Sequence, residues 1–100
     1  MMQGDSYGLP IEILRDGKAV TPEDVTNVEI SVGSITKTYA KNKVYYSNGM
    51  WIIPLSQEET FNLPAASVRV QARVMWATGG VTGVDLGDID VIDSISKEVL

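Results

Sequence analysis

The chain has 100 residues, of which 44% are apolar and 21% charged, and its formal net charge is −5. It contains no cysteine and no histidine, which excludes disulfides, thiolate or imidazole catalysis, iron–sulfur clusters and structural zinc sites. Only eight basic residues are present, and they are scattered, so nucleic acid is not an expected partner.

The first third of the chain predicts strands joined by turns. Leu9, Ile11 and Ile13 share one parity, and the Asp16-Gly17 pair that follows suits a hairpin turn. Residues 21–25 have the pattern of a helix start but are too short to form a helix. A second strand is predicted over 25–33, with its apolar residues on one face.

The middle of the chain predicts two further strands over 35–40 and 44–46 and then a hairpin. Asn48-Gly49 is typical of a type I′ turn, and residues 50–54 read as a buried strand that Pro54 ends. Ser56 and Glu59 have the spacing of a capping box, so a short helix is predicted over 56–62. Its apolar neighbours should dock it on a sheet; they are Leu55, Phe61 and Leu63.

The last third predicts a hairpin of two long strands, over 67–76 and from 81 to about 92. In the second strand the apolar parity changes between Leu86 and Ile89, which predicts a β-bulge at Gly87. The bulge interpretation predicts that Asp88 and Asp90 are exposed. It also predicts that four apolar residues are buried: Val84, Leu86, Ile89 and Val91. The alternative is a cation site, in which Asp85, Asp88 and Asp90 would converge.

Taken together, the elements predict an all-β fold, an antiparallel immunoglobulin-like (Ig-like) β-sandwich of seven to eight short strands with one short helical turn at about 56–62. A partly closed barrel is the alternative. We expect one domain over 1–100, with frayed ends at 1–4 and 95–100.

The sequence offers candidate contact residues but no predicted catalytic, cofactor-binding or metal-binding residue, and no cofactor. Adjacent strand residues face opposite ways, so one of Tyr45 and Tyr46 should be exposed, and their hairpin is the better interface candidate. Arg69 and Arg73 lie on one face of the 67–76 strand. The predicted interface residues are therefore Tyr45, Tyr46, Trp51, Arg69 and Arg73, whereas Trp76 is expected in the core.

Several short patterns carry a family resemblance. They are an opening Gly-Asp before an extended segment, "L-S-x-E-E-T" at 55–60, "V-x-V-x-A-R-V" at 68–74, and "I-x-V-x-x-S-I-S" at 89–96. In this order they resemble small Ig-like domains of tailed bacteriophages and prophages of Gram-positive bacteria. They are similar to the N-terminal domains of phage baseplate upper proteins. The segment 34–49 does not take part in the resemblance.

The resemblance implies a non-enzymatic structural protein of a phage tail or baseplate that acts through protein–protein contacts. Its expected partners are other tail or baseplate proteins and further copies of itself, and its expected location is the host cytoplasm during assembly and then the virion. No secretory signal is recognisable, and no apolar run approaches the ~20 residues of a membrane span, so no membrane partner is expected.

Two other functions remain open from the sequence. A carbohydrate-binding module would use Tyr45, Tyr46 and Trp51, which should then be exposed and nearly coplanar. A small enzyme would need a concave site with convergent carboxylates, for which a chain of this size leaves little room.

Overall fold

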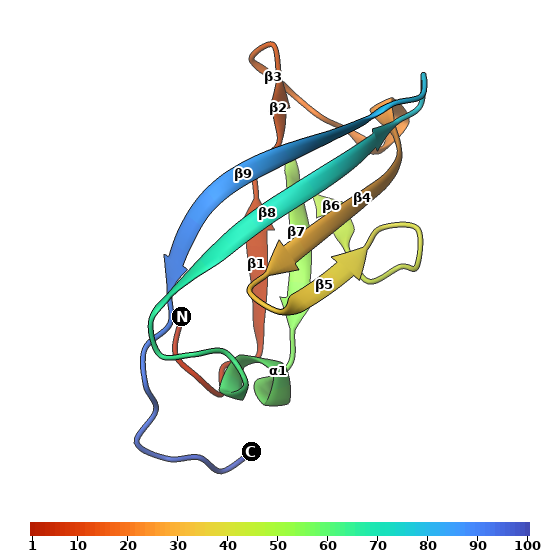
Figure 1. Ribbon diagram of the computed structural model, residues 1–100. Helices are drawn as coiled ribbons and strands as arrows, with labels where there is room; N and C mark the ends of the chain where they lie inside the picture. Colours follow the sequence, from red (N-terminus) through yellow and green to blue (C-terminus); the bar gives the residue numbers. More distant parts are fainter.

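Two antiparallel sheets packed face to face form the body of the protein, whose residues 1–100 are all described by a computed structural model (Figure 1). The nine strands are β1 (Tyr7–Ile11), β2 (Leu14–Arg15), β3 (Lys18–Ala19), β4 (Val25–Val32), β5 (Ile35–Thr38), β6 (Tyr45–Ser47), β7 (Met50–Leu55), β8 (Ser67–Trp76) and β9 (Val81–Asp90). Two short helical segments complete the fold, the 3₁₀ turn η1 (Pro22–Asp24) and the helix α1 (Gln57–Phe61).

The strand order is that of an Ig-like sandwich. One sheet has the order β1-β7-β6 and the other β5-β4-β8-β9, with β2 and β3 as a separate hairpin. These orders correspond to strands B-E-D and C′-C-F-G of immunoglobulin domains. The predicted all-β sandwich is confirmed. The strand count exceeds the predicted one because two-residue strands flank the Asp16-Gly17 turn.

The predicted hairpin turns have the backbone that their sequences require. Asn48 and Gly49 have φ of 50° and 80°, and Asp16 and Gly17 have 52° and 77°. A type I′ turn needs positive φ at both central residues, which Asn, Asp and Gly tolerate best. The two turns therefore join β6 to β7 and β2 to β3 in tight register.

The core is one layer of apolar side chains between the sheets. Alternate residues of β4 and β8 are buried in it, as the period-two pattern predicted. The 18 buried core residues are Leu9, Ile11, Ile13, Val20, Val25, Val28, Ile30, Val32, Val44, Trp51, Ile53, Leu55, Leu63, Val68, Val70, Ala72, Val74 and Val91.

The bulge in β9 is present where the change of parity predicted it. Arg69 pairs with Asp88 and Gln71 with Asp85, so Leu86 and Gly87 together lie opposite one residue of β8. Gly87 has a φ of 85°, a conformation that glycine adopts without steric cost. Asp88 and Asp90 are exposed, as expected.

The predicted burial along β9 was only partly right. Val91 is buried, whereas Val84, Leu86 and Ile89 are half-buried. The reason is that β9 is the last strand of its sheet, and β1, the nearest strand of the opposite sheet, is itself an edge strand. One side of the sandwich is therefore incompletely covered.

The two ends of the chain differ. Residues 1–4 were expected to be frayed, but Gln3 N donates to Ile92 O at 2.8 Å, Ile92 N donates to Met1 O at 2.8 Å, and Gly4 N donates to Thr60 Oγ1 at 2.9 Å. Residues 95–100 form no strand or helix and leave the body of the sandwich (Figure 1).

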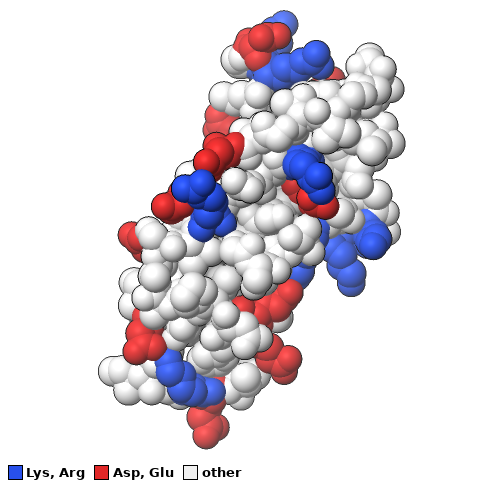
Figure 2. Space-filling view, in the orientation of Figure 1, with Lys and Arg blue, Asp and Glu red and all other residues white.

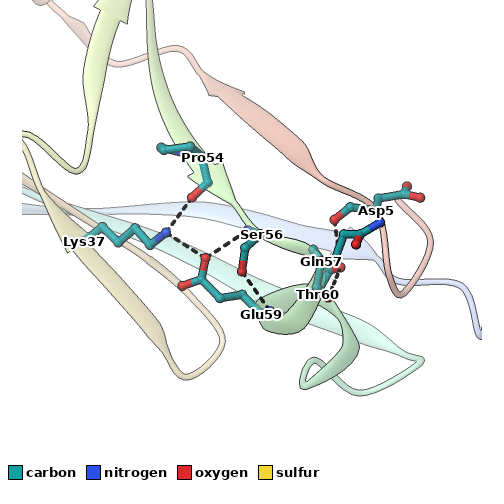
Figure 3. Close-up of polar contacts among 7 residues, drawn as sticks. All are labelled: Asp5, Lys37, Pro54, Ser56, Gln57, Glu59 and Thr60. Carbon is teal, nitrogen blue, oxygen red and sulfur yellow. Dashed lines mark hydrogen bonds and ion pairs between the residues drawn. The ribbon is translucent and has the colours of Figure 1, made fainter. Parts of the chain in front are cut away.

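Helix α1 begins with the predicted capping box. Glu59 N donates to Ser56 Oγ at 3.2 Å, and the Glu59 carboxylate accepts from Ser56 N at 2.9 Å (Figure 3). Leu55 and Leu63 are buried beside the helix as predicted, but Phe61 is only half-buried. The buried residue of the helix is Thr60, whose hydroxyl donates to Asp5 O at 2.9 Å.

Lys37 joins the two sheets and the helix. It lies opposite the buried Ile30, so its side chain enters the sandwich from the edge strand β5. Its Nζ donates to Pro54 O at 2.7 Å and to Glu59 Oε1 at 2.8 Å (Figure 3).

Pro54 does not end β7 as predicted. It lies beyond the last residue that pairs with β6, where a missing N–H removes no ladder bond.

The same contacts set the ionisation of Glu59. Partial burial by itself would raise the pKa of Glu59. Hydrogen bonds from Lys37 and Ser56, together with the positive charge of Lys37, outweigh that effect and hold this pKa below its ordinary value. The carboxylate is therefore kept ionised where it caps the helix.

Replacing Gly87 by Ala should destabilise the protein by about 1 kcal/mol, because alanine at positive φ is strained even though space for its Cβ is open. Gly83→Ala is the matched control, since Gly83 lies in the same strand, has equally open space and has no positive φ. Urea unfolding of both variants measures the difference. Equal stabilities would contradict the bulge geometry.

Glu59→Gln should lower the free energy of unfolding at neutral pH by roughly 0.5–1 kcal/mol through loss of the ion pair with Lys37. Because the folded-state pKa of Glu59 is lowered, its contribution is present above the unfolded-state pKa and is lost as pH falls through the folded-state pKa. The stability gap between the native chain and the variant should therefore close in acid, as urea unfolding at several pH values can show. Glu58→Gln, on the exposed side of α1, should show no such gap.

Candidate interaction surfaces

The Tyr45–Trp51 hairpin places its aromatic residues on two different faces. Tyr45 lies on the outer face of the three-stranded sheet and is 51% exposed. Tyr46 points inward and is half-buried. The prediction that these two side chains face opposite ways, with one exposed, is confirmed.

Trp51 is not available for an interface, and its prediction as an interface residue was wrong. The side chain is fully buried, and its Nε1 donates to Val20 O at 2.9 Å. The rings of Tyr39 and Tyr46 meet it edge-on, with centroids 5.2 and 5.1 Å away. An indole that is surrounded in this way is a core residue with a satisfied donor. The aromatic platform that carbohydrate binding would use is therefore not formed.

Trp76, which was expected in the core, is only half-buried at the end of β8. Its Nε1 donates to Thr82 Oγ1 at 3.0 Å, and the Arg15 guanidinium lies 4.3 Å from the ring centroid. The indole sits where the sheet ends, so it is covered by the hairpin of β2 and β3 and not by the opposite sheet. The contact with Arg15 is of the cation–π type.

The outer face of the three-stranded sheet carries no charged side chain. Strand pairing places a set of seven residues on this face, which we call the uncharged outer face: Gly8, Pro10, Tyr45, Ser47, Met50, Ile52 and Pro54. Tyr45 lies over Ile52 and Gly8, since a Cβ built on Gly8 would lie 3.1 Å from Ile52 Cγ2 and 3.8 Å from the Tyr45 hydroxyl. Uncharged faces that carry a large aromatic residue are typical of contact surfaces.

The outer face of the four-stranded sheet is charged, and its arginines are paired with acids (Figure 2). Arg73 contacts Glu29 through Nε at 2.9 Å and Nη2 at 2.8 Å. Arg69 lies between Asp85 and Asp88, at 3.6 and 3.7 Å. Both arginines are exposed, as the sequence predicted, and their role in an interface stays a prediction.

The acidic residues of β9 do not converge on one point. Asp85 Oδ1 accepts from Gly87 N at 3.0 Å, and Asp90 Oδ1 accepts from Ser67 Oγ at 3.2 Å. No group of three or more acidic side chains is placed to hold a metal ion. The cation-site alternative therefore has no geometric basis, and the carboxylates serve the bulge and the ion pairs with Arg69.

An apolar groove lies along the incompletely covered side of the sandwich, between β1 and β9. Its volume is about 200 Å³. The residues that form it, here called the β1–β9 groove, are Leu9, Pro10, Ile11, Glu12, Val70, Leu86 and Ile89. The inward parity of Leu86 and Ile89 is the one sign of this groove in the sequence, but parity does not tell whether a neighbouring strand covers these two residues.

The structure has no helix whose length and hydropathy would allow it to cross a lipid bilayer.

Comparison of this chain with protein-family models, with curated proteins and with solved structures found no match.

Trp51→Ala should cost about 3–5 kcal/mol, because it empties the centre of the core and leaves Val20 O without its donor. Tyr45→Ala should change the free energy of unfolding by less than about 1 kcal/mol, because half of the Tyr45 side chain is already in solvent. Urea unfolding followed by circular dichroism compares the two. Equal losses would contradict this placement of the aromatic residues.

Proposed function

We propose that this protein is a non-enzymatic structural component of a phage or prophage tail or baseplate, and that it acts through protein–protein contacts. The observation that carries the proposal is the uncharged outer face around Tyr45. About one residue in five of the chain is charged, and a complete sheet face without any charge is the surface best suited to contact with another protein.

The Ig-like strand order is compatible with this role. The order B-E-D and C′-C-F-G gives a small rigid sandwich with two outer faces, and many cell-surface and assembly proteins use such a module for contacts. Fold alone does not assign a function. The link to tails and baseplates comes from the sequence resemblance at 55–60, 68–74 and 89–96.

The two outer faces suggest different parts in assembly. The uncharged outer face suits a desolvated contact with a further copy or with a neighbouring tail protein. The ion-paired face with Arg69 and Arg73 suits a contact whose strength depends on salt, because exposed ion pairs are screened and contribute little each.

The test is the mass of the protein in solution. Size exclusion with light scattering, from about 10 μM to about 1 mM, should show association of weak to moderate affinity. Ile52→Lys places a charge in the uncharged outer face beside Tyr45 and should weaken that association at least tenfold.

Thr78→Lys is the matched control, since Thr78 is exposed in the turn between β8 and β9, outside both outer faces. A chain that stays monomeric across this range would count against the proposal, as would equal effects of the two substitutions. Tail genes beside the gene for this chain would support it.

A further inference from the structure

The sandwich lacks the strand that normally borders strand B of an Ig-like domain. In those domains the sheet order is A-B-E-D, so strand A pairs with the outer edge of strand B. Here β1 occupies the position of B and has β7 as its only neighbour. The residues before β1 do not fill the place of A, because Gln3 N bonds to Ile92 O and Met2 forms its bridge with Ile92, beyond the end of β9.

The outer edge of β1 presents free backbone groups. Pro54 O is bound by Lys37 on the side of β7 that faces away from β1, so Gly8 and Pro54 form a non-hydrogen-bonded pair. The N–H and C=O of Gly8 and the C=O of Pro10 therefore point away from β7. Pro10 has no N–H, so this edge offers fewer donors than acceptors.

The other edges are protected against pairing, whereas β1 is less so. The edge strand β9 has a bulge at Gly87 and carries Asp85, Asp88 and Asp90. Strand β5 has an inward-pointing charge, Lys37, and β6 is three residues long. Bulges, charges and short strands are the devices that prevent edge-to-edge pairing. β1 has no charged residue, and Pro10 is its one protection.

The groove beside this edge has room for apolar side chains. Leu86 and Ile89 are half-buried in its floor, which accounts for their incomplete burial in β9. The rim carries one free negative charge, because Glu12 is exposed and enters no ion pair. A segment laid here would meet an apolar floor that includes Leu86 and Ile89, and the free carboxylate of Glu12 at its rim.

We propose that the β1–β9 groove receives an extended segment of a partner protein, which pairs with β1 in the place of strand A. The segment has apolar residues at alternate positions, directed at Leu86 and Ile89, and Lys or Arg between them, directed at the rim with Glu12. This is β-strand addition, in which backbone bonds give affinity and alternate side chains give specificity. The inference rests on the proposed function in assembly and names the partner chemistry.

The probe is the acetylated peptide Lys-Val-Lys-Ile-Lys-Val-Lys, titrated into the full chain and followed by NMR. Saturable shifts should appear at the Gly8 amide and at the methyl groups of Leu86 and Ile89, with slower hydrogen exchange of the Gly8 N–H. A peptide of the same composition without alternation, and one with Glu in place of Lys, should each bind at least tenfold more weakly.

Two variants test the floor and the rim separately. Leu86→Lys should abolish peptide binding, and its thermal unfolding shows whether it still folds. Glu12→Lys changes only an exposed side chain and should weaken binding of the basic peptide about threefold while improving binding of the acidic one. Glu23→Lys, exposed in η1 and outside the groove, is the matched control and should have no effect.

Besides the absence of any peptide binding, three results would overturn the inference. One is equal binding of the alternating and rearranged peptides, which would indicate charge attraction alone. Another is a set of shifts that maps outside the groove. The third is a Gly8 N–H already protected in the concentrated protein alone, which would make a second copy the occupant.

If no peptide binds while Ile52→Lys still disrupts self-association, this inference fails and the proposed function stands. If the peptide binds and the chain stays monomeric, this inference stands and the proposed function fails.

Discussion

The buried indole of Trp51 is the interaction on which the arrangement of this sandwich depends. It stands at the start of β7, and its N–H satisfies Val20 O, at the end of the crossover that carries β2 and β3. Tyr39, just after β5, and Tyr46, in β6, close on its ring. One side chain thus contacts the neighbouring strand β6 and two connections between strands. An aromatic residue with a satisfied donor can fill such a position without the cost of an orphaned polar group.

Lys37 has a related part at the opposite end of the sandwich. Burying the Lys37 ammonium group between the sheets would be costly if it had no partner. Pro54 O and the Glu59 carboxylate both accept hydrogen bonds from it, which offsets that cost. The same carboxylate caps α1, so the helix, β5 and β7 share one polar contact. The helix is only five residues long and would not be stable by itself.

Local patterns in the sequence predicted most of the fold, because the physics that decides it is local. The period of two in β8, the Asn-Gly turn, the capping box and the parity change at Gly87 each depend on neighbouring residues, and each is confirmed. What could not be predicted depends on which strands become neighbours. The burial of Trp51 and the groove beside Leu86 follow from the pairing of β7 with β1 and from the missing strand A, and the partial exposure of Trp76 follows from its place at the end of β8. Strand periodicity is the same whether the next strand is present or absent.

The strand order also has a consequence for how the chain folds. Four of its pairings are hairpins between consecutive strands, β2 with β3, β4 with β5, β6 with β7, and β8 with β9, and such hairpins close in microseconds. The remaining two pairings, β1 with β7 and β4 with β8, join segments far apart in the sequence, for example Tyr7 with Leu55. Bringing these distant segments together costs chain entropy before any of their stabilising contacts form. These two pairings are therefore the slow steps of folding. Refolding should therefore take milliseconds to seconds, with the hairpin of β8 and β9 formed well before β1 finds its place.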